Sequence, residues 1–172
     1  MTIAIPRPSL VVLIGPSGAG KSTFARKHFK RTETVSSDFC RALVSDDESD
    51  QSATESAFEV VRLIAAKRLS AGRLTVVDAT SVQPHARVPL VALAHEHNVP
   101  AIAIVLNLPE ELCIARSQAR PGRPAPAEVV QSQVRDLTGS LPGLLSEGFQ
   151  LVCLLSAPGE VDDADVVIST AM

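Results

Sequence analysis

Residues 15–23 combine glycines, a lysine and hydroxyl side chains at a spacing suited to binding phosphates. They match the pattern G-x-x-x-x-G-K-[ST]. Glycines let backbone amides approach a phosphate, the lysine supplies a positive charge, and a serine hydroxyl is a suitable Mg²⁺ ligand. The alternative is a glycine-rich turn, but an apolar run precedes the motif and a helical run follows it. The motif therefore predicts that ATP or another NTP binds with Mg²⁺ through Gly15, Ser17, Gly18, Ala19, Gly20, Lys21, Ser22 and Thr23, with Ser22 as a metal ligand.

Asp38 and Arg41 form a second group of residues that are suited to chemistry. They are three residues apart, so they share one face of the helix expected to follow a short strand at 34–37. Asp38 would cap that helix in the simplest interpretation. In an α/β sheet, however, ligands bind beyond the carboxyl ends of the strands, where Asp38 would lie. The local sequence leaves both roles open.

Asp78 ends a mostly apolar run, Leu74–Thr75–Val76–Val77. A carboxylate at this place after a buried strand is typical of the acid that reaches Mg²⁺ in proteins with a phosphate-binding loop. The alternative is an aspartate that opens a turn with Thr80 and Ser81. The presence of the loop at 15–23 favours the Mg²⁺ role for Asp78.

Arg116 and Arg120 precede the sequence Pro121–Gly122–Arg123–Pro124, which contains Arg123. Arginines on such a segment are suited to a lid that closes over phosphates and screens developing negative charge. The alternative is an exposed basic end of a helix. We predict a nucleotide-binding lid formed by these three arginines.

The pattern of apolar runs indicates the elements that position these residues. Strands are expected at 9–14, 34–37, 74–78, 99–106 and 149–155, and residues 1–8 are expected to be a leader without a strand. Helices are expected at 21–30, from 38, at 53–71 behind a Ser52–Glu55 capping box, at 84–97, from Pro109 to about 120, and within 125–147. The tail at 160–168 is expected to be a helix or an edge strand. This alternation predicts a doubly wound α/β fold of the P-loop NTPase type, with a parallel sheet of about five strands.

Composition narrows the class of protein further. A length of 172 residues predicts one domain, and a net charge of −3 argues against non-specific nucleic-acid binding. The chain has no Trp or Tyr, so most base-stacking side chains are absent. Three scattered cysteines without metal-ligand spacing predict reduced thiols and a cytoplasmic protein. No apolar run is long enough to span a membrane, and none is expected to contact one.

The sequence resembles the kinase module of bacterial polynucleotide kinase-phosphatase, an RNA repair enzyme, over about residues 14–155. The resemblance is carried by GPSGAGKSTFARKHF (15–29), SSDFCRALVSDDESDQSAT (36–54), AFEVV (57–61), LTVVDAT (74–80), VLNLPE (105–110) and the arginines after it. It implies transfer of the ATP γ-phosphate to a 5′-OH end of RNA or DNA.

The resemblance also implies roles for the site residues other than Asp78, which matches its DAT segment without a defined role. Lys21 and Ser22 would hold the ATP phosphates and Mg²⁺, Asp38 would be the general base, and Arg41 would place the acceptor end. Arg116 and Arg123 would bracket the transferring phosphate, with Arg120 in the same lid. The family places a phosphatase and a ligase-like domain after this module and has an RNA-methylating repair partner. The lid of this sequence departs from the family pattern in its prolines Pro121, Pro124 and Pro126.

Two other functions compete with this one. A small-molecule P-loop kinase would share the loop, the acid after the second strand and a lid. A non-catalytic nucleotide-binding module would bind ATP without turnover. A GTP switch is disfavoured because the sequence has no N-K-x-D motif.

Overall fold

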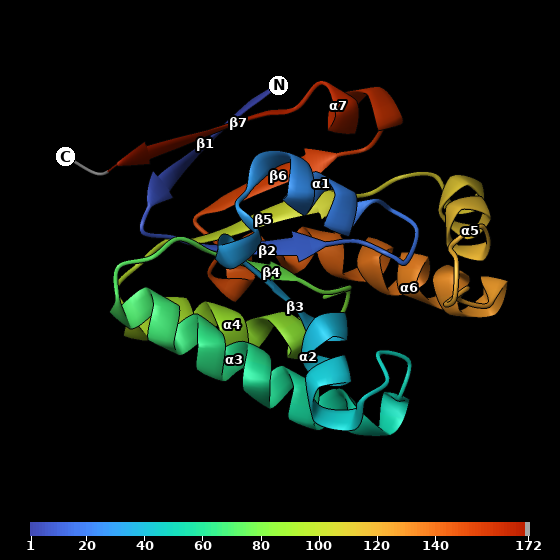
Figure 1. Cartoon of the computed structure of the whole chain (residues 1–172). Coiled ribbons are helices and arrows are strands. Elements are labelled where there is room, and N and C mark those ends of the chain that lie inside the picture. Colours follow the sequence, from blue (N-terminus) through green and yellow to red (C-terminus); the bar gives the residue numbers. More distant parts are fainter. Residues whose placement is uncertain (171–172) are drawn as a thin grey trace.

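The computed structural model describes residues 1–170 and is built around a five-stranded parallel sheet (Figure 1). Its strand order is β3 (Thr34–Ser36), β4 (Thr75–Asp78), β2 (Leu10–Ile14), β5 (Ala101–Leu106) and β6 (Leu151–Leu155). All four neighbouring pairs run parallel. The order changes direction at β2, which places the residues after this strand at the switch point where α/β sheets bind ligands. The predicted α/β fold is confirmed.

The central strand β2 is buried on both faces, which explains its continuous apolar sequence. Leu10, Val12 and Ile14 pack into one core cluster. Val11 and Leu13 point the other way and pack into a second core cluster. Since successive side chains in a strand alternate between faces, only an unbroken apolar run can satisfy two cores.

Helices cover both faces of the sheet (Figure 1). Residues of α2 (Ser37–Ser45), α3 (Thr54–Ser70) and α4 (Pro84–Glu96) pack into the first cluster. Residues of α1 (Lys21–His28) and α5 (Glu110–Gln118) pack into the second, and α6 (Ala127–Ser140) contributes to both. The short helices are η1 (Arg31–Glu33), η2 (Gln51–Ala53), η3 (Leu141–Gly143), η4 (Leu145–Glu147) and α7 (Pro158–Asp162). No helix within residues 1–170 is both long and apolar enough to cross a membrane.

The start of α3 differs from the prediction. The residue at its N-cap is Ala53, so Ser52 and Glu55 do not form the expected capping box. Asp50 instead accepts hydrogen bonds from the Ser52 amide at 2.9 Å and the Ser52 hydroxyl at 2.6 Å. Asp50 is thus the N-cap of the short helix η2, which contains Ser52 and leads directly into α3.

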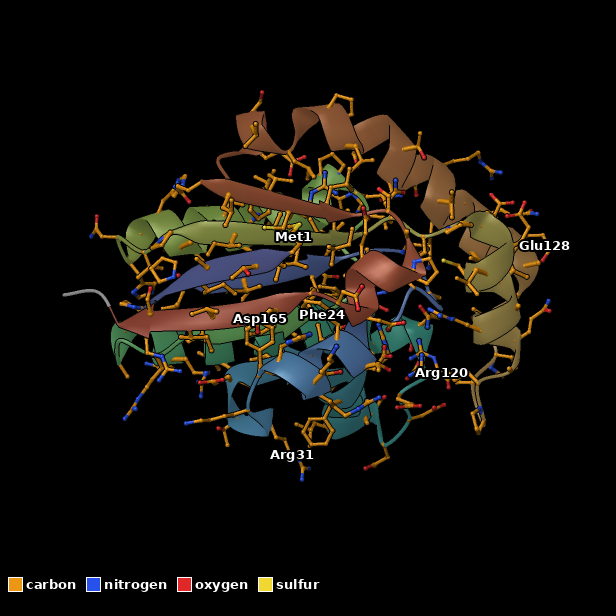
Figure 2. All side chains as sticks on the ribbon, turned by 90° about the horizontal axis from the view of Figure 1, so that it is seen from above. Met1, Phe24, Arg31, Arg120, Glu128 and Asp165 are labelled. Atoms are coloured by element: carbon orange, nitrogen blue, oxygen red, sulfur yellow. The ribbon has the colours of Figure 1, made fainter. Side chains whose placement is uncertain are left out.

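The leader predicted for residues 1–8 is wrong, because Thr2–Arg7 forms strand β1. It pairs in parallel with β7 (Asp165–Thr170) in a separate two-stranded sheet. The Asp165 amide donates to the Met1 carbonyl at 2.9 Å, and both residues lie over the same face of the main sheet (Figure 2). Ile3 and Ile5 are buried in the second core cluster. The strand forms despite Pro6 because the apolar residues on either side of Ala4 face the core.

Candidate active site

The P-loop joins β2 to α1 and packs directly on neighbouring backbone. Gly18 and Gly20 have positive φ angles of 81° and 95°, and Gly20 is the N-cap of α1. A Cβ at Gly18 would overlap the carbonyl oxygen of Cys113 in α5, and one at Gly15 would lie 2.7 Å from the Leu106 carbonyl. The sequence therefore needs glycine here both for backbone conformation and for space.

Lys21 folds back over this loop. Its Nζ donates to the carbonyl oxygens of Gly15 at 2.7 Å and Pro16 at 2.9 Å. Burial lowers the pKa of Lys21 to about 8, although the charges of Asp78 and Asp38 act to raise it. The fold thus places one cation and two carboxylates around the loop, and an incoming phosphate would replace carbonyl oxygens as the partner of Lys21.

A side chain from α6 also reaches the loop. The Ser17 amide donates to Gln133 Oε1 at 2.8 Å. Backbone amides of such loops are the groups that bind phosphates, so Gln133 occupies a donor that a nucleotide would use. Sequence reasoning missed Gln133, since nothing in a helical run at 127–140 marks one glutamine among its polar residues.

Asp38 does not cap α2, so that alternative is excluded. The cap is Ser36, whose hydroxyl accepts from the Phe39 amide at 3.3 Å. The Asp38 carboxylate instead contacts Arg41 and Arg123, each at 2.8 Å, and Arg120 at 3.7 Å. Burial alone would raise the pKa of Asp38, but the Arg123 and Arg41 guanidinium groups outweigh it and hold the pKa below its usual value. Asp38 is therefore ionised at neutral pH.

The predicted lid arginines lie on two sides of the site. Arg116, near the end of α5, has its Nη1 3.9 Å from the position of a Cβ on Gly20. Arg120 and Arg123 follow α5 in the loop that leads to α6, and both contact Asp38. The loop is attached to α5 by a hydrogen bond of 3.3 Å from the Ala125 amide to the Ser117 hydroxyl. One arginine thus lies beside the P-loop and two lie beside Asp38.

Asp78 is the last residue of β4 and pairs in register with Leu13 and Ser36 of the flanking strands. It is 8% exposed and forms no ion pair with any residue of 1–170. The segment after it is attached to the P-loop, because the Gly15 amide donates to the Thr80 carbonyl at 3.0 Å. Ser22 lies in the first turn of α1. A buried carboxylate without a cationic partner, close enough to influence Lys21, is a suitable Mg²⁺ ligand.

Arg87 in α4 contacts the segment that follows Asp78. Its side chain is fully buried and forms a bidentate pair with Glu147 at 2.5 and 2.7 Å. Its Nη1 also donates to the Ser81 carbonyl at 2.9 Å, at a residue whose φ of 51° is unusual for serine. Sequence reasoning missed this pair, because Glu147 lies far from Arg87 in the chain and neither residue belongs to a motif.

The model of AAA_33, described as an AAA domain, matches residues 10–144. The chain belongs to this family. The match includes the P-loop, Asp38, Asp78 and the lid arginines of this AAA_33 domain. The domain is P-loop kinase-like, and ATP binding is typical of the family.

Individual proteins similar to this AAA_33 domain differ in what they do. A solved structure of the Pnkp1/Rnl/Hen1 RNA repair complex is 26% identical, with a TM-score of 0.69 over 79% of this chain and 46% of the matched chain. A gluconokinase from Sinorhizobium meliloti is 16% identical, with a TM-score of 0.58 over 92% of this chain and 87% of that one. At this identity, the similarity to the gluconokinase shows only a shared fold.

One curated protein, the Arabidopsis thaliana transcription factor bHLH140, is 27% identical over 161 residues. The match covers 90% of this chain, which spans only 17% of that protein's length.

Proposed function

We propose that the protein is a polynucleotide kinase that transfers the γ-phosphate of ATP to the 5′-OH end of RNA or DNA. One observation carries the proposal. Asp38 is an ionised carboxylate held by Arg41 and Arg123, and it lies close enough to the P-loop for its charge to raise the pKa of Lys21. This arrangement supports the proposal, because it provides a carboxylate that could bind the acceptor near a loop that could bind the donor phosphates. Phosphoryl transfer needs these two sides in line.

The donor side is formed by the P-loop and the end of β4. Lys21 would bind the β- and γ-phosphates in place of the Gly15 and Pro16 carbonyls, and the loop amides would bind the remaining oxygens. Ser22 and Asp78 would hold Mg²⁺, which when bound with ATP neutralises charge on the phosphates. Residues 1–170 contain no cluster of three or more His, Cys, Asp and Glu side chains that could hold a metal, and Mg²⁺ in such sites is bound by few protein ligands together with the nucleotide.

The acceptor side is formed by Asp38 and Arg41. Asp38 would accept a hydrogen bond from the acceptor hydroxyl, orient it toward the γ-phosphate and take its proton. Arg41 is 6% exposed at its side chain and donates to the Glu48 carbonyl at 3.1 Å as well as to Asp38, so it holds the carboxylate in place. Arg116 approaches from the donor side and Arg123 from the acceptor side, which is where two cations could bracket the transferring phosphate.

Two observations favour a nucleic-acid acceptor over a small metabolite. The first is the 26% identity to the Pnkp1/Rnl/Hen1 RNA repair complex. The second is an exposed apolar surface on α2 next to Asp38, where Phe39 is 57% exposed, Leu43 61% and Val44 43%. Phe39 offers an aromatic face on which the terminal base could stack. A sugar acid would gain little from such a surface.

We further propose that this kinase domain operates as the N-terminal module of a longer repair enzyme. The similar RNA repair structure contains Rnl and Hen1, and this chain covers 46% of the chain it matches there. Phosphatase and ligase-like domains and an RNA-methylating partner are the corresponding components that the sequence resemblance implies.

The proposal is tested by transfer of labelled γ-phosphate from ATP to 5′-OH oligonucleotides of RNA and DNA, with gluconate as a small-molecule acceptor. We expect labelled oligonucleotide, no labelled gluconate, and no transfer by Lys21→Ala. Transfer to gluconate alone would establish the small-molecule kinase, and ATP binding without transfer to either acceptor would establish the non-catalytic module.

A further inference from the structure

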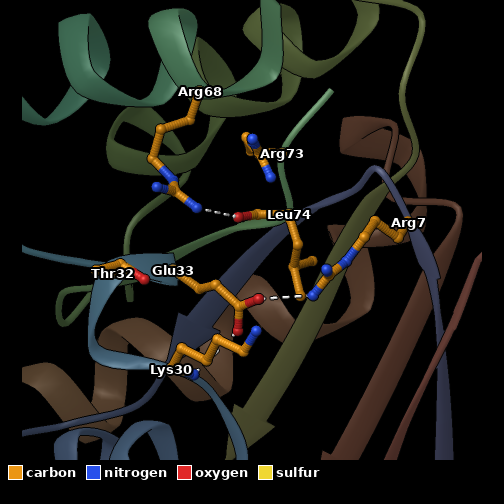
Figure 3. Close-up of a pocket in the computed structure, with 7 residues that line it drawn as sticks. All are labelled: Arg7, Lys30, Thr32, Glu33, Arg68, Arg73 and Leu74. Atoms are coloured by element: carbon orange, nitrogen blue, oxygen red, sulfur yellow. Dashed lines mark hydrogen bonds and ion pairs between the residues drawn. The ribbon is translucent and has the colours of Figure 1, made fainter. Parts of the chain in front are cut away.

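A basic pocket lies away from the P-loop, at the other end of the main-sheet strands, and Figure 3 shows the side chains that line it. Arg7 ends β1, Lys30 and Glu33 precede β3, and Arg73 and Leu74 precede β4. Because Arg7 also comes shortly before β2, the pocket lies at the amino ends of main-sheet strands, whereas the P-loop follows the carboxyl end of β2. Thr32 and Arg68, which lies near the end of α3, complete the lining. No part of the proposed kinase site belongs to this pocket.

The pocket carries an excess of positive charge. Four of its side chains are cations, namely those of Arg7, Lys30, Arg68 and Arg73, and one is a carboxylate, that of Glu33. The Glu33 side chain is already used: Oε1 pairs with Arg7 at 2.6 Å, and Oε2 accepts from the Lys30 amide at 2.9 Å. The formal charge of the pocket is therefore about +3, on a chain whose net charge is −3.

The remaining cations have no carboxylate to neutralise them. Within residues 1–170, Lys30, Arg68 and Arg73 form no ion pair. Arg68 donates to the Leu74 carbonyl at 2.8 Å, but the Nε atoms of Arg7 and Arg68 are buried without a hydrogen-bond acceptor in that part of the chain. Burial lowers the pKa of Arg68; the charge of Glu33 opposes this effect, and the charges of Arg73 and Arg7 add to it. The cations thus repel one another, and a bound anion would relieve this repulsion.

We propose that this pocket binds a phosphate group. Guanidinium groups match the oxygens of phosphate in geometry and charge, and Lys30 adds a mobile point charge. The cavity has a volume of about 190 Å³, below the range of roughly 300–1,000 Å³ typical of pockets for larger organic ligands. This size selects a single phosphate over a whole nucleotide. The group comes from free inorganic phosphate or from a phosphodiester of a nucleic-acid strand, and the site is independent of the proposed kinase activity.

The first experiment titrates inorganic phosphate into the full chain by calorimetry, in a Lys21→Ala background that weakens phosphate binding at the P-loop. Arg73→Ala is the test variant because its exposed side chain forms no hydrogen bond or ion pair within residues 1–170. Arg31→Ala is the matched control, since Arg31 is also exposed and lies next to Lys30 but does not line the pocket. We expect Arg73→Ala to weaken phosphate binding at least tenfold and Arg31→Ala to change it less than twofold.

The second experiment distinguishes the two sources of phosphate. It measures the affinity of a 5′-phosphorylated single-stranded oligonucleotide, which carries no acceptor hydroxyl at that end, for the same variants. A loss of oligonucleotide affinity specific to Arg73→Ala, with a shallower salt dependence, assigns the site to a nucleic-acid strand. If Arg73→Ala specifically loses affinity for inorganic phosphate and not for the oligonucleotide, the site is assigned to the free ion. Equal losses for Arg73→Ala and Arg31→Ala, or no specific loss with either ligand, would overturn the proposal.

Discussion

The guanidinium group of Arg123 lies 2.8 Å from the carboxylate of Asp38, so the predicted lid contacts the predicted acceptor residue directly. The two residues are far apart in the chain and come from separate elements, the loop after α5 and the first turn of α2. This contact neutralises a cation that would otherwise lie in the site without a partner. Phosphoryl transfer would require Arg123 to exchange part of this contact for the phosphate.

We expect Arg123→Ala to lower kcat by roughly 10³-fold, because an arginine that stabilises the transferring phosphate contributes on this scale. Thermal stability should change little, since the pair with Asp38 is partly exposed. Steady-state kinetics and a melting curve measure the two effects. Arg135→Ala, at an exposed arginine on α6, is the control that should retain normal turnover. A kcat close to that of the wild type would show that Arg123 takes no part in catalysis.

Asp38→Ala should abolish transfer while ATP still binds, because Asp38 lies on the acceptor side of the site. The depressed pKa of Asp38 keeps it ionised through the whole neutral range, so its titration should not limit activity between about pH 5 and 8. Calorimetry of nucleotide binding and an activity profile against pH measure both points. Joint loss of binding and activity would show that Asp38 has a structural role.

Lys21 gives nucleotide binding a pH dependence. Its pKa of about 8 in the free protein would rise when triphosphate binds, because negative charge favours the protonated amine. Binding should therefore take up a proton above pH 8, and the affinity for ATP should fall by up to about tenfold per pH unit between pH 8 and 10. Calorimetry in buffers of different ionisation enthalpy detects the proton. Lys21→Ala should bind weakly at every pH, without this slope.

Phe39→Ala should raise KM for an oligonucleotide by about tenfold or more and leave KM for ATP unchanged, since base–aromatic stacking contributes about 1–3 kcal/mol. Leu63→Ala on α3 is the control, because Leu63 is similarly exposed at 58%. Kinetics with both substrates measure the change. An unaltered KM for the oligonucleotide would exclude Phe39 as a stacking surface.

Glu147→Ala should lower the free energy of unfolding by about 3–5 kcal/mol, because it leaves the buried Arg87 without its partner. Glu96→Ala, at an exposed glutamate of α4, should change stability by less than about 0.5 kcal/mol. Urea titration measures both. Recovery of stability in an Arg87→Met/Glu147→Leu double variant would attribute the loss to the unpaired charge.

Gly18→Ala should disrupt the P-loop, because the added Cβ would overlap the Cys113 carbonyl and the φ of Gly18 is 81°. We expect loss of ATP binding and a lower Tm. Gly139→Ala in α6 is the opposite case: a Cβ there meets nothing within 4 Å, and alanine favours a helix by about 1 kcal/mol. Tolerance of alanine at Gly18 would contradict the tight packing of this loop on α5.

The sequence was sufficient to predict those features whose signals are local. The P-loop, the five parallel strands and the start of α4 at Pro84 all follow from spacing within about ten residues. Other features depend on partners that the local sequence does not contain. Gln133 matters only because α6 brings it to Ser17, and Arg87 only because Glu147 lies beside it. The prediction that Ser52 caps α3 is wrong, because the Ser52 hydroxyl donates a hydrogen bond to Asp50 instead.

Strand β1 is the clearest example of this limit. Pro6 within the strand and Pro8 after it argue against a strand here. Its partner β7 lies at the other end of the described chain. Burial of Ile3 and Ile5 outweighs that local preference only once the whole core exists. The strand is therefore a property of the tertiary structure.

The pairing of β1 with β7 also orders events during synthesis. The ribosome releases β1 before the main sheet and β7 after it, so the edge of β1 that pairs with β7 has no partner until residues 165–170 have been synthesised. A chain truncated before Asp165 would leave this edge of β1 open to pairing with other chains. The strand that pairs with β1 thus also protects this edge from association with other chains.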